Sequence, residues 1–190
     1  MWQNIFSLII DTFTTLYLMV ILLRFVLQLA RADFYNPISQ FIVKATNPLV
    51  MPFRKIIPGF GGVDLASLVL AFAFQFLMIA IKLLVLAGGL PNIGSVLAIS
   101  VVLVLGALLK LYFWSLLIMI VASWIAPGSS HPILLLINQI CEPIMQPFRR
   151  IMPNMGGLDL SPILVFLSLQ VLSIVLSEVA RQLGFSFALI

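Results

Sequence analysis

Two short basic segments hold the side chains best suited to chemistry in this sequence, and that chemistry is the binding of phosphate. Each segment reads Pro-Phe-Arg followed by Lys or Arg, at residues 52–55 and 147–150. A guanidinium donates paired hydrogen bonds to phosphate oxygens, and a phenylalanine beside it can enter the acyl chains of a bilayer. We therefore expect anionic lipid head groups or a protein partner to bind at Phe53, Arg54, Lys55, Phe148, Arg149 and Arg150. Ordinary anchoring of positive charge at the membrane surface is the alternative.

A glycine pair and an aspartate follow each basic segment at the same distance. Glycine allows a turn with positive φ, and an aspartate at the start of a helix accepts hydrogen bonds from its first N–H groups. We expect a turn and a helix cap at each place, with a cation or partner site shared by the two carboxylates as the alternative. The residues are Gly61, Gly62 and Asp64 in the first copy, and Gly156, Gly157 and Asp159 in the second.

Several polar and charged side chains lie inside apolar stretches, where each is costly without a polar partner. Besides Arg24 and Glu178, five of them are Asp11, Gln75, Lys82, Lys110 and Gln170. We expect Gln75 and Gln170 to face inward and to hydrogen-bond each other. Asp11 is expected to pair with Lys82 or Lys110, and a polar path for an ion is the alternative role of all five. Arg24, close to the end of the first stretch, is expected to extend toward the membrane surface.

No residue pattern in the sequence indicates catalysis or metal binding. The sequence has one histidine, His131, and one cysteine, Cys141, which excludes a disulfide framework within the chain and a Cys/His zinc site. It contains neither a Gly-rich phosphate loop nor a nucleophile elbow. We therefore expect no metal, no cofactor and no enzymatic activity.

The elements that must position these side chains are membrane-spanning helices. Hydrophobic residues make up 63% of the 190 residues, charged residues make up 8%, and the mean hydropathy is +1.23, whereas a soluble domain carries about 25% charged residues. Four stretches can cross a bilayer, at about residues 5–29, 65–87, 95–125 and 160–183. The third is too long for an upright span and must tilt, protrude or break, most easily at Gly106. The net charge of +4 is too sparse for nucleic acid but suits an anionic membrane surface.

The sequence repeats itself at a distance of 95 residues. Moved by this distance, Asn47-Pro48 falls on Glu142-Pro143, the first basic segment falls on the second, and Gln75 falls on Gln170. This tandem duplication divides the chain into two units, 1–94 and 95–190. Each unit holds two spans, so both insert in the same orientation, as parallel repeats about a pseudo-two-fold axis along the membrane normal. The predicted fold is an all-α membrane protein with four transmembrane helices in two tandem two-helix repeats.

The long loop of each unit is predicted to hold short amphipathic helices that lie at the membrane interface. In the first loop, one helix begins at Asn36-Pro37, and a second begins at Asn47-Pro48, kinks near Pro52 and ends before Pro58. The second loop repeats this plan from His131-Pro132. The two loops carry six of the ten basic residues, so we expect both loops in the cytoplasm and both chain termini outside.

The second copy of the motif resembles the hallmark of the YggT family, also called YlmG. The resemblance is carried by Glu-Pro at 142–143, Pro-Phe-Arg-Arg at 147–150 and Gly-Gly-Leu-Asp-Leu-Ser-Pro at 156–162. The first copy departs from it with Lys55 in place of arginine and Ala66-Ser67 in place of Ser-Pro. The resemblance covers nearly the whole chain and implies a small multi-spanning protein of the bacterial inner membrane. It also implies roles in osmotic or ion homeostasis, in division and nucleoid distribution, or, in plastids, in cytochrome cofactor assembly.

Two functions are compatible with these residues. The first is a non-enzymatic scaffold or assembly factor, whose basic loops bind anionic lipids and whose protein partners belong to the membrane or to the division machinery. The second is an ion transporter or channel component, in which the bundle encloses a polar path past Gln75 and Gln170. The spans lack the broken helices on which midplane ion sites usually depend, which favours the scaffold. A homo-oligomer is compatible with either function, and no direct contact with nucleic acid is expected.

Overall fold

The structure is a computed structural model that describes residues 2–59, 61–87, 92–151 and 159–184, and within these residues helices joined by turns and loops make up the fold. Four helices, α1, α3, α4 and α6, are long and apolar enough to cross a membrane, so the chain is a multi-pass membrane protein. The predicted spans match these helices to within three residues at each end. The helices are α1 (Trp2–Leu29), α2 (Pro37–Ile56), α3 (Leu65–Ala87), α4 (Ile93–Ile125), α5 (Pro132–Ile151) and α6 (Ser161–Gln182).

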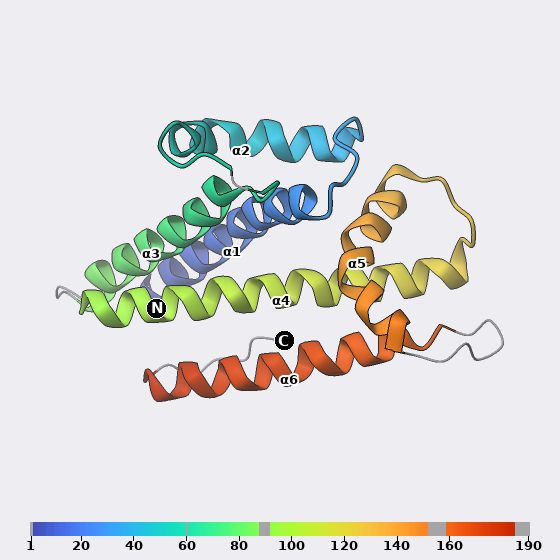
Figure 1. The fold of residues 1–190 in the computed structure, drawn as a ribbon. Helices are drawn as coiled ribbons and strands as arrows, with labels where there is room; N and C mark the ends of the chain where they lie inside the picture. The colour runs from blue at the N-terminus through green and yellow to red at the C-terminus, as the bar shows by residue number, and fades with distance from the viewer. Residues whose placement is uncertain (1, 60, 88–91, 152–158, 185–190) are drawn as a thin grey trace.

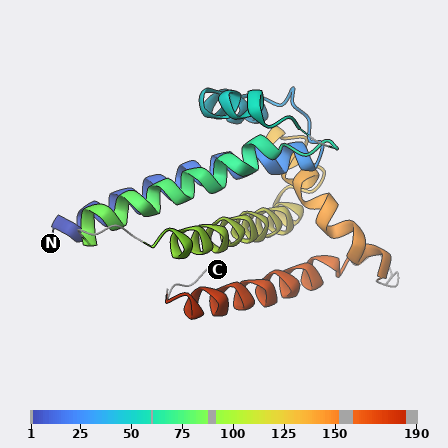
Figure 2. The same ribbon diagram turned by 60° about the vertical axis from the view of Figure 1, so that its left-hand side comes forward.

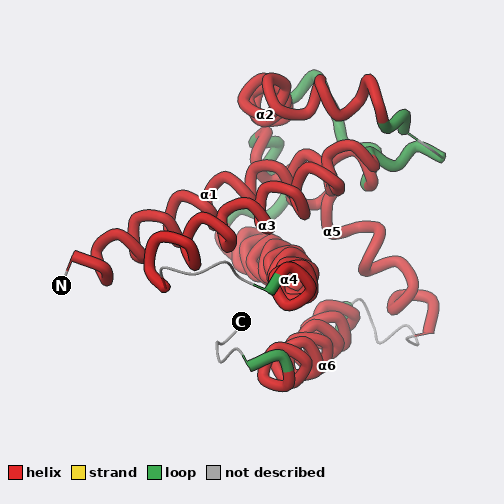
Figure 3. Tube along the Cα trace, turned by 90° about the vertical axis from the view of Figure 1, so that its left-hand side faces the viewer, coloured by secondary structure: helices red, strands yellow, loops and turns green. Residues whose placement is uncertain are grey.

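Helix α4 lies at the centre of the molecule. It packs against α1 and α3 on one side and against α6 on the other, and Figure 3 shows it nearly end-on between them. Helix α3 contacts both α1 and α4, whereas its counterpart α6 contacts α4 and α5 but, within the described ranges, not α1. The two repeats are therefore alike in their elements but not in their packing.

Helices α2 and α5 cover the end of the molecule where α1 and α4 finish. Helix α2 packs on α1 and α3, and α5 takes the equivalent place against α4 and α6 (Figures 1 and 2). The Asn36 side chain caps α2 by accepting a hydrogen bond from the Ile38 N–H at 3.0 Å, which confirms the predicted helix start. Asn36 also donates to the Pro132 carbonyl at 2.7 Å, so the two amphipathic helices are joined at their beginnings.

The prediction of two separate short helices in each loop is wrong. Helix α2 runs without interruption over Pro37–Ile56 although Pro48 and Pro52 lie inside it, and α5 likewise contains two prolines. A proline inside a helix leaves a carbonyl one turn earlier without its donor. The carbonyl that Pro48 leaves without a donor is that of Lys44. The carbonyls on either side of it are bonded from α1, because Arg24 donates to the Val43 carbonyl at 3.3 Å and the Tyr17 hydroxyl donates to the Ala45 carbonyl at 3.3 Å. These contacts hold this turn of α2 against α1.

The apolar core lies at the end of the spans that α2 and α5 cover. Its fully buried side chains come from the first five helices, and include Ile21, Leu22, Val26, Leu27, Val50, Ala66, Ala71, Leu116, Ile140 and Met145. Large apolar side chains on the outer faces of the spans, such as Leu8 and Leu167, are exposed. That distribution is the one expected of helices whose outer faces contact lipid.

Helix α4 is continuous through Gly106 over its 33 residues. At 1.5 Å per residue it is about 50 Å long, well beyond the hydrocarbon core of about 30 Å. The helix therefore does not break at Gly106, which was one of the three ways expected to accommodate the long third span. The other two ways are a tilt of α4 and its extension beyond the hydrocarbon core.

The reactivity of the single cysteine, Cys141, is a test of how α5 packs. Cys141 is fully buried in the core. Burial, with a smaller contribution from the Glu142 carboxylate, raises the pKa of its thiol to about 12. We expect N-ethylmaleimide at pH 7.5 to label the folded protein at least about tenfold more slowly than a variant carrying Ser130→Cys at an exposed position, because the thiolate is the nucleophile. Unfolding in SDS should make the two cysteines equally reactive. Equal rates in the folded state would contradict the packing of α5.

Candidate functional site

The candidate site is built around an ion pair between Arg24 of α1 and Asp64, the residue just before α3. The Arg24 Nε atom lies 3.4 Å from Asp64 Oδ2, and the two side chains are only 3% and 2% exposed. A buried arginine is strongly unfavourable unless an opposite charge and further hydrogen bonds compensate it. This pair therefore fixes the end of the first span against the beginning of the second.

Helix α2 supplies the remaining partners of Arg24. The Nη1 atom donates to Thr46 Oγ1 at 2.7 Å, to Asn47 Oδ1 at 2.9 Å and to the Val43 carbonyl at 3.3 Å. The Thr46 hydroxyl in turn donates to the Ile42 carbonyl at 2.7 Å, which fixes the direction of its lone pairs. One guanidinium thus joins α1, α2 and α3.

Arg54, near the end of α2, shares the Asp64 carboxylate with Arg24. Its Nη2 atom donates to Asp64 Oδ2 at 2.7 Å and to Gln28 Oε1 at 3.1 Å. The Arg54 side chain is nevertheless 44% exposed. Because a guanidinium carries five N–H donors, Arg54 keeps donors for a ligand while these two contacts hold its orientation.

Asp64 also forms the cap of α3. The Ser67 N–H and hydroxyl donate to its carboxylate at 3.2 and 2.7 Å, and the turn before it contains Gly61 and Gly62 at φ values of 61° and 85°. Burial alone would raise the pKa of Asp64, but the hydrogen bonds from Arg54 and Ser67 outweigh burial and hold that pKa below its usual value. The Asp64 carboxylate therefore contributes its full stabilisation above about pH 4. That contribution is lost as the pH falls through the pKa that Asp64 has in the folded protein.

A cleft of about 700 Å³ opens beside this network. Asp64 offsets one of the three cationic side chains there, which leaves two positive charges, and Lys55 forms no ion pair with any residue in the described ranges. Phe53, by contrast, is half-buried against the apolar core, as is Phe148 in the second copy. The cleft is lined by Arg24, Val43, Asn47, Pro48, Met51, Pro52, Arg54 and Lys55.

The second copy of the motif reverses this charge arrangement. The Arg149 Nη1 atom bonds both carboxylate oxygens of Glu142, at 2.9 and 2.7 Å, and its Nε atom bonds Asp159 Oδ2 at 3.0 Å. Asp159 also accepts the Ser161 N–H at 2.9 Å at the start of α6. Two carboxylates therefore share one arginine here, and with Arg150 the local charge is balanced. Gly156 and Gly157, the turn predicted before Asp159, lie outside the described residues.

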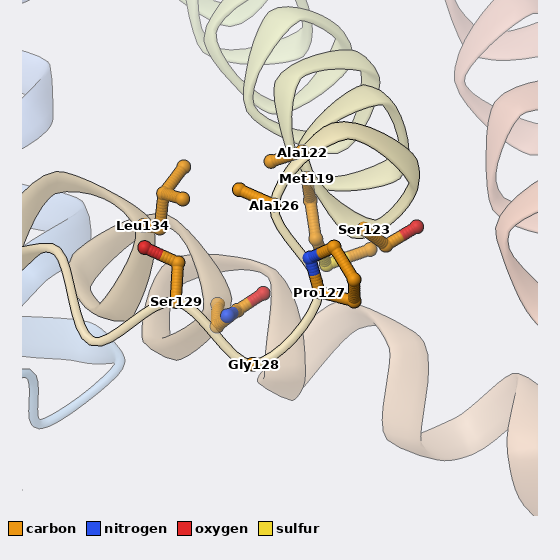
Figure 4. A pocket seen from close by; sticks show the side chains of 9 residues that line it. Met119, Ala122, Ser123, Ala126, Pro127, Gly128, Ser129 and Leu134 are labelled. Carbon is orange, nitrogen blue, oxygen red and sulfur yellow. The ribbon is translucent and has the colours of Figure 1, made fainter.

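Methionine stands in the second copy where the first has the buried arginine. Met119 is aligned with Arg24, and Ser123 with Gln28, at the repeat distance of 95 residues. A cavity of about 290 Å³ lies at this place, and Figure 4 shows Met119 and Ser123 at its wall beside the turn at residues 127–129. The polar network of the first copy thus has a cavity as its counterpart in the second.

Two of the polar side chains inside the spans form an ion pair, and three line a pocket. Asp11 forms an ion pair with Lys82 at 2.7 Å, which is one of the two pairings expected. Asp11, Gln75 and Lys110 line a pocket of about 270 Å³ between α1, α3 and α4. The buried hydroxyl of Thr14 also lines it and has no hydrogen-bond partner in the described part of the chain.

The structure does not bring Gln170 to Gln75. The Gln75 side chain is buried at the pocket between α1 and α4, whereas Gln170 is exposed on α6. The two helices that carry them do not touch within the described ranges. The reason is that α6 packs on the side of α4 away from α1, so that the pocket receives a glutamine from the first repeat alone (Figure 3).

The residue that sequence reasoning missed is Arg24. The expectation that its side chain extends to the membrane surface is wrong, because that side chain is buried against α2 and Asp64. One signal in the sequence could have found it. The repeat alignment pairs Arg24 with Met119 and Asn47 with Glu142, so a charge and a possible partner change together between the copies.

The ion pair predicts very different effects of one substitution in the two repeats. We expect Asp64→Asn to lower the free energy of unfolding by about 3–5 kcal/mol, because it leaves Arg24 buried without a counter-charge. The matched change Asp159→Asn should cost at most about 1 kcal/mol, because its pair is about half exposed. Asparagine can cap a helix in both places. Unfolding of the purified protein by SDS in mixed micelles measures both values.

A second variant separates the lost pair from other effects of Asp64→Asn. Arg24→Met installs the residue of the second copy, and in the Asp64→Asn background it removes the uncompensated charge. We expect the double variant to be more stable than Asp64→Asn alone. Equal losses for Asp64→Asn and Asp159→Asn, or no recovery in the double variant, would contradict the assigned role of the buried pair.

Comparison with known proteins agrees with this two-copy architecture. The family model described as CCB3/YggT matches residues 3–85 and again residues 98–180. The chain is 51% identical to an uncharacterized protein of Pseudomonas aeruginosa, over 93% of this chain and 90% of that one. It is 38% identical to the uncharacterized protein YggT of Escherichia coli, over 96% and 94% of the two chains.

A plastid protein matches a shorter part of the chain. The chloroplastic YlmG homolog protein 2 of Arabidopsis thaliana is 39% identical over 61 residues, which are 32% of this chain and 24% of that protein. No solved structure matches the chain. The two matches of the family model are offset by 95 residues, the distance at which the sequence repeats itself. The chain belongs to the CCB3/YggT family and carries the family's repeat twice in tandem.

Proposed function

We propose that this protein is a non-enzymatic scaffold or assembly factor of the bacterial inner membrane, whose first repeat binds the phosphate of an anionic lipid. The observation that carries this proposal is the cleft beside Arg24, Arg54 and Lys55 with its two uncompensated positive charges. Arg54 is oriented by Asp64 and Gln28 before any ligand arrives. A preoriented guanidinium loses less freedom on binding phosphate than a free side chain does.

The surroundings of the cleft suit a lipid more than a dissolved anion. Helix α2 exposes large apolar side chains close to the basic ones, among them Met51 and Ile56, which are 59% and 81% exposed. Met51 also lines the cleft. An amphipathic helix with such a face lies at the boundary between head groups and acyl chains. The phosphate would then reach the arginines while the acyl chains cover the apolar side chains of α2.

The second repeat is suited to a different partner. Its Arg149 is already bonded to two carboxylates, and the local charge is balanced. An anionic lipid gains little from such a surface. We assign it to a protein partner in division, nucleoid placement or the assembly of membrane proteins. The first two of these roles are among those that the family resemblance implies. In the proposed topology both surfaces face the cytoplasm.

The two repeats supply a matched test of lipid binding. We expect Lys55→Gln to weaken the binding of phosphatidylglycerol about fivefold, which corresponds to the loss of about 1 kcal/mol for one basic residue at an anionic surface. The control is Arg150→Gln at the aligned position, which should change the affinity less than about twofold. Native mass spectrometry of purified protein titrated with the lipid gives both affinities. Equal weakening by the two substitutions would overturn the assignment to the first repeat.

Ion transport remains the second candidate function, and one observation favours it. The pocket between α1, α3 and α4 gathers Asp11, Gln75 and Lys110, and it adds the unbonded hydroxyl of Thr14. Polar side chains that meet inside a membrane often mark the path of an ion. The pocket would have to be continuous with both surfaces for a path to exist.

Flux measurements separate the two candidates. We expect potassium and sodium flux in proteoliposomes no higher than in protein-free vesicles, as a scaffold requires. If the pocket instead conducts, Gln75→Leu should abolish the flux, whereas Gln170→Leu should leave it unchanged because that side chain is outside the pocket. Flux with this pattern would replace the scaffold by a transporter.

A further inference from the structure

Gln170 is a polar side chain on the outer surface of a membrane span. It lies near the middle of α6, about 14 Å from the first residue of the helix at 1.5 Å per residue. Its side chain is exposed, and no hydrogen bond joins its amide to any residue that the structure describes. Its counterpart in the first repeat, Gln75, is buried. The glutamine at this repeat position is therefore buried in the first repeat and exposed in the second.

An amide in this position is costly unless a partner bonds it. A glutamine side chain has two N–H donors and a carbonyl with two lone pairs. Acyl chains can bond none of these groups, and water is absent from the middle of a bilayer. In membrane proteins such side chains are found between helices, where they hydrogen-bond across the contact.

The neighbours of Gln170 form a regular stripe. Ile163, Leu167 and Ile174 are 62%, 61% and 67% exposed, and with Gln170 they are spaced by four, three and four residues. This is the spacing of a helix face that packs against a parallel helix with a left-handed crossing. A single polar residue within such a stripe fixes the register of the two helices.

We propose that two copies of the chain associate through this stripe of α6 as a parallel homodimer, with the two Gln170 amides hydrogen-bonded to each other. Both copies enter the membrane in the same orientation, so a two-fold axis along the membrane normal brings the two glutamines together at the same depth. The amide is self-complementary, because each side chain donates to the carbonyl of the other. Any other partner would need a polar group at this depth on its own surface.

The packing of the spans leaves this stripe free to form the contact. Helix α6 touches α4 and α5 within the described residues, while α3 is held between α1 and α4. Figures 1 and 2 show α6 at the edge of the molecule, with one long side facing away from the other spans. The association requires no rearrangement of the four spans.

The proposal is tested by measuring dimerisation in liposomes. Protein with Cys141→Ala and a dye on Ser130→Cys is reconstituted over a range of protein-to-lipid ratios, and single-molecule photobleaching counts the copies per complex. We expect a density-dependent monomer–dimer equilibrium. Gln170→Leu should weaken it roughly threefold to thirtyfold, the effect of losing hydrogen bonds between helices in a membrane. A wild type that is monomeric at every density would overturn the proposal.

A matched variant shows whether the position of the amide matters. Gln170→Leu combined with Leu172→Gln keeps the composition of α6 but moves the glutamine to another side of the helix. We expect this variant to dimerise as weakly as Gln170→Leu alone. Recovery of wild-type dimerisation would mean that polarity and not the stripe drives association, and would overturn the proposed interface.

Cross-linking locates the contact without relying on the affinity. In the Cys141→Ala background, Gln170→Cys should form an intermolecular disulfide under mild oxidation, whereas Leu172→Cys should not. The folded state of each variant is checked by its unfolding in SDS. Cross-linking at 172 in preference to 170 would place the contact on another face and contradict the proposal.

Discussion

The buried ion pair between Arg24 and Asp64 is the interaction on which the first repeat depends. Its two side chains come from the end of α1 and the start of α3, and hydrogen bonds from the same guanidinium bring α2 onto both. The position of α2 in turn places Arg54 and Lys55 at the cleft. A charge so deeply buried is stable only while all its partners stay in place. The geometry of the proposed lipid site therefore follows from a contact made inside the protein.

The two repeats pair the charged side chains at the ends of their spans in different ways. The change from Arg24 to Met119 removes a cation, and the change from Asn47 to Glu142 adds a carboxylate. Two arginines share a carboxylate in the first repeat, and two carboxylates share an arginine in the second. The charges of the second arrangement balance, whereas the first keeps an excess of positive charge. Divergence after duplication thus separated two surfaces that began alike.

The sequence predicted the features that depend on local pattern. The lengths of the spans and the Asn36 cap follow from residues close together in the chain, and the repeat distance follows from comparing the sequence with itself. The uninterrupted course of α2 through Pro48 does not, because it depends on tertiary contacts such as the one Arg24 makes with this turn. The exposure of Gln170 could not be predicted either. It results from α6 packing on one side of α4 alone, and no property of α6 itself determines that choice.

The distance in sequence between the two partners of the buried pair affects how the protein is made. Arg24 precedes Asp64 by 40 residues. At about 5–20 residues per second, the ribosome needs roughly 2–8 s to synthesise the intervening chain. During that interval the first span carries an arginine that has no counter-ion, and its charge has to be solvated by head groups or water. The buried pair, and with it the contact between the end of α1 and the start of α3, can form only after Asp64 has been synthesised.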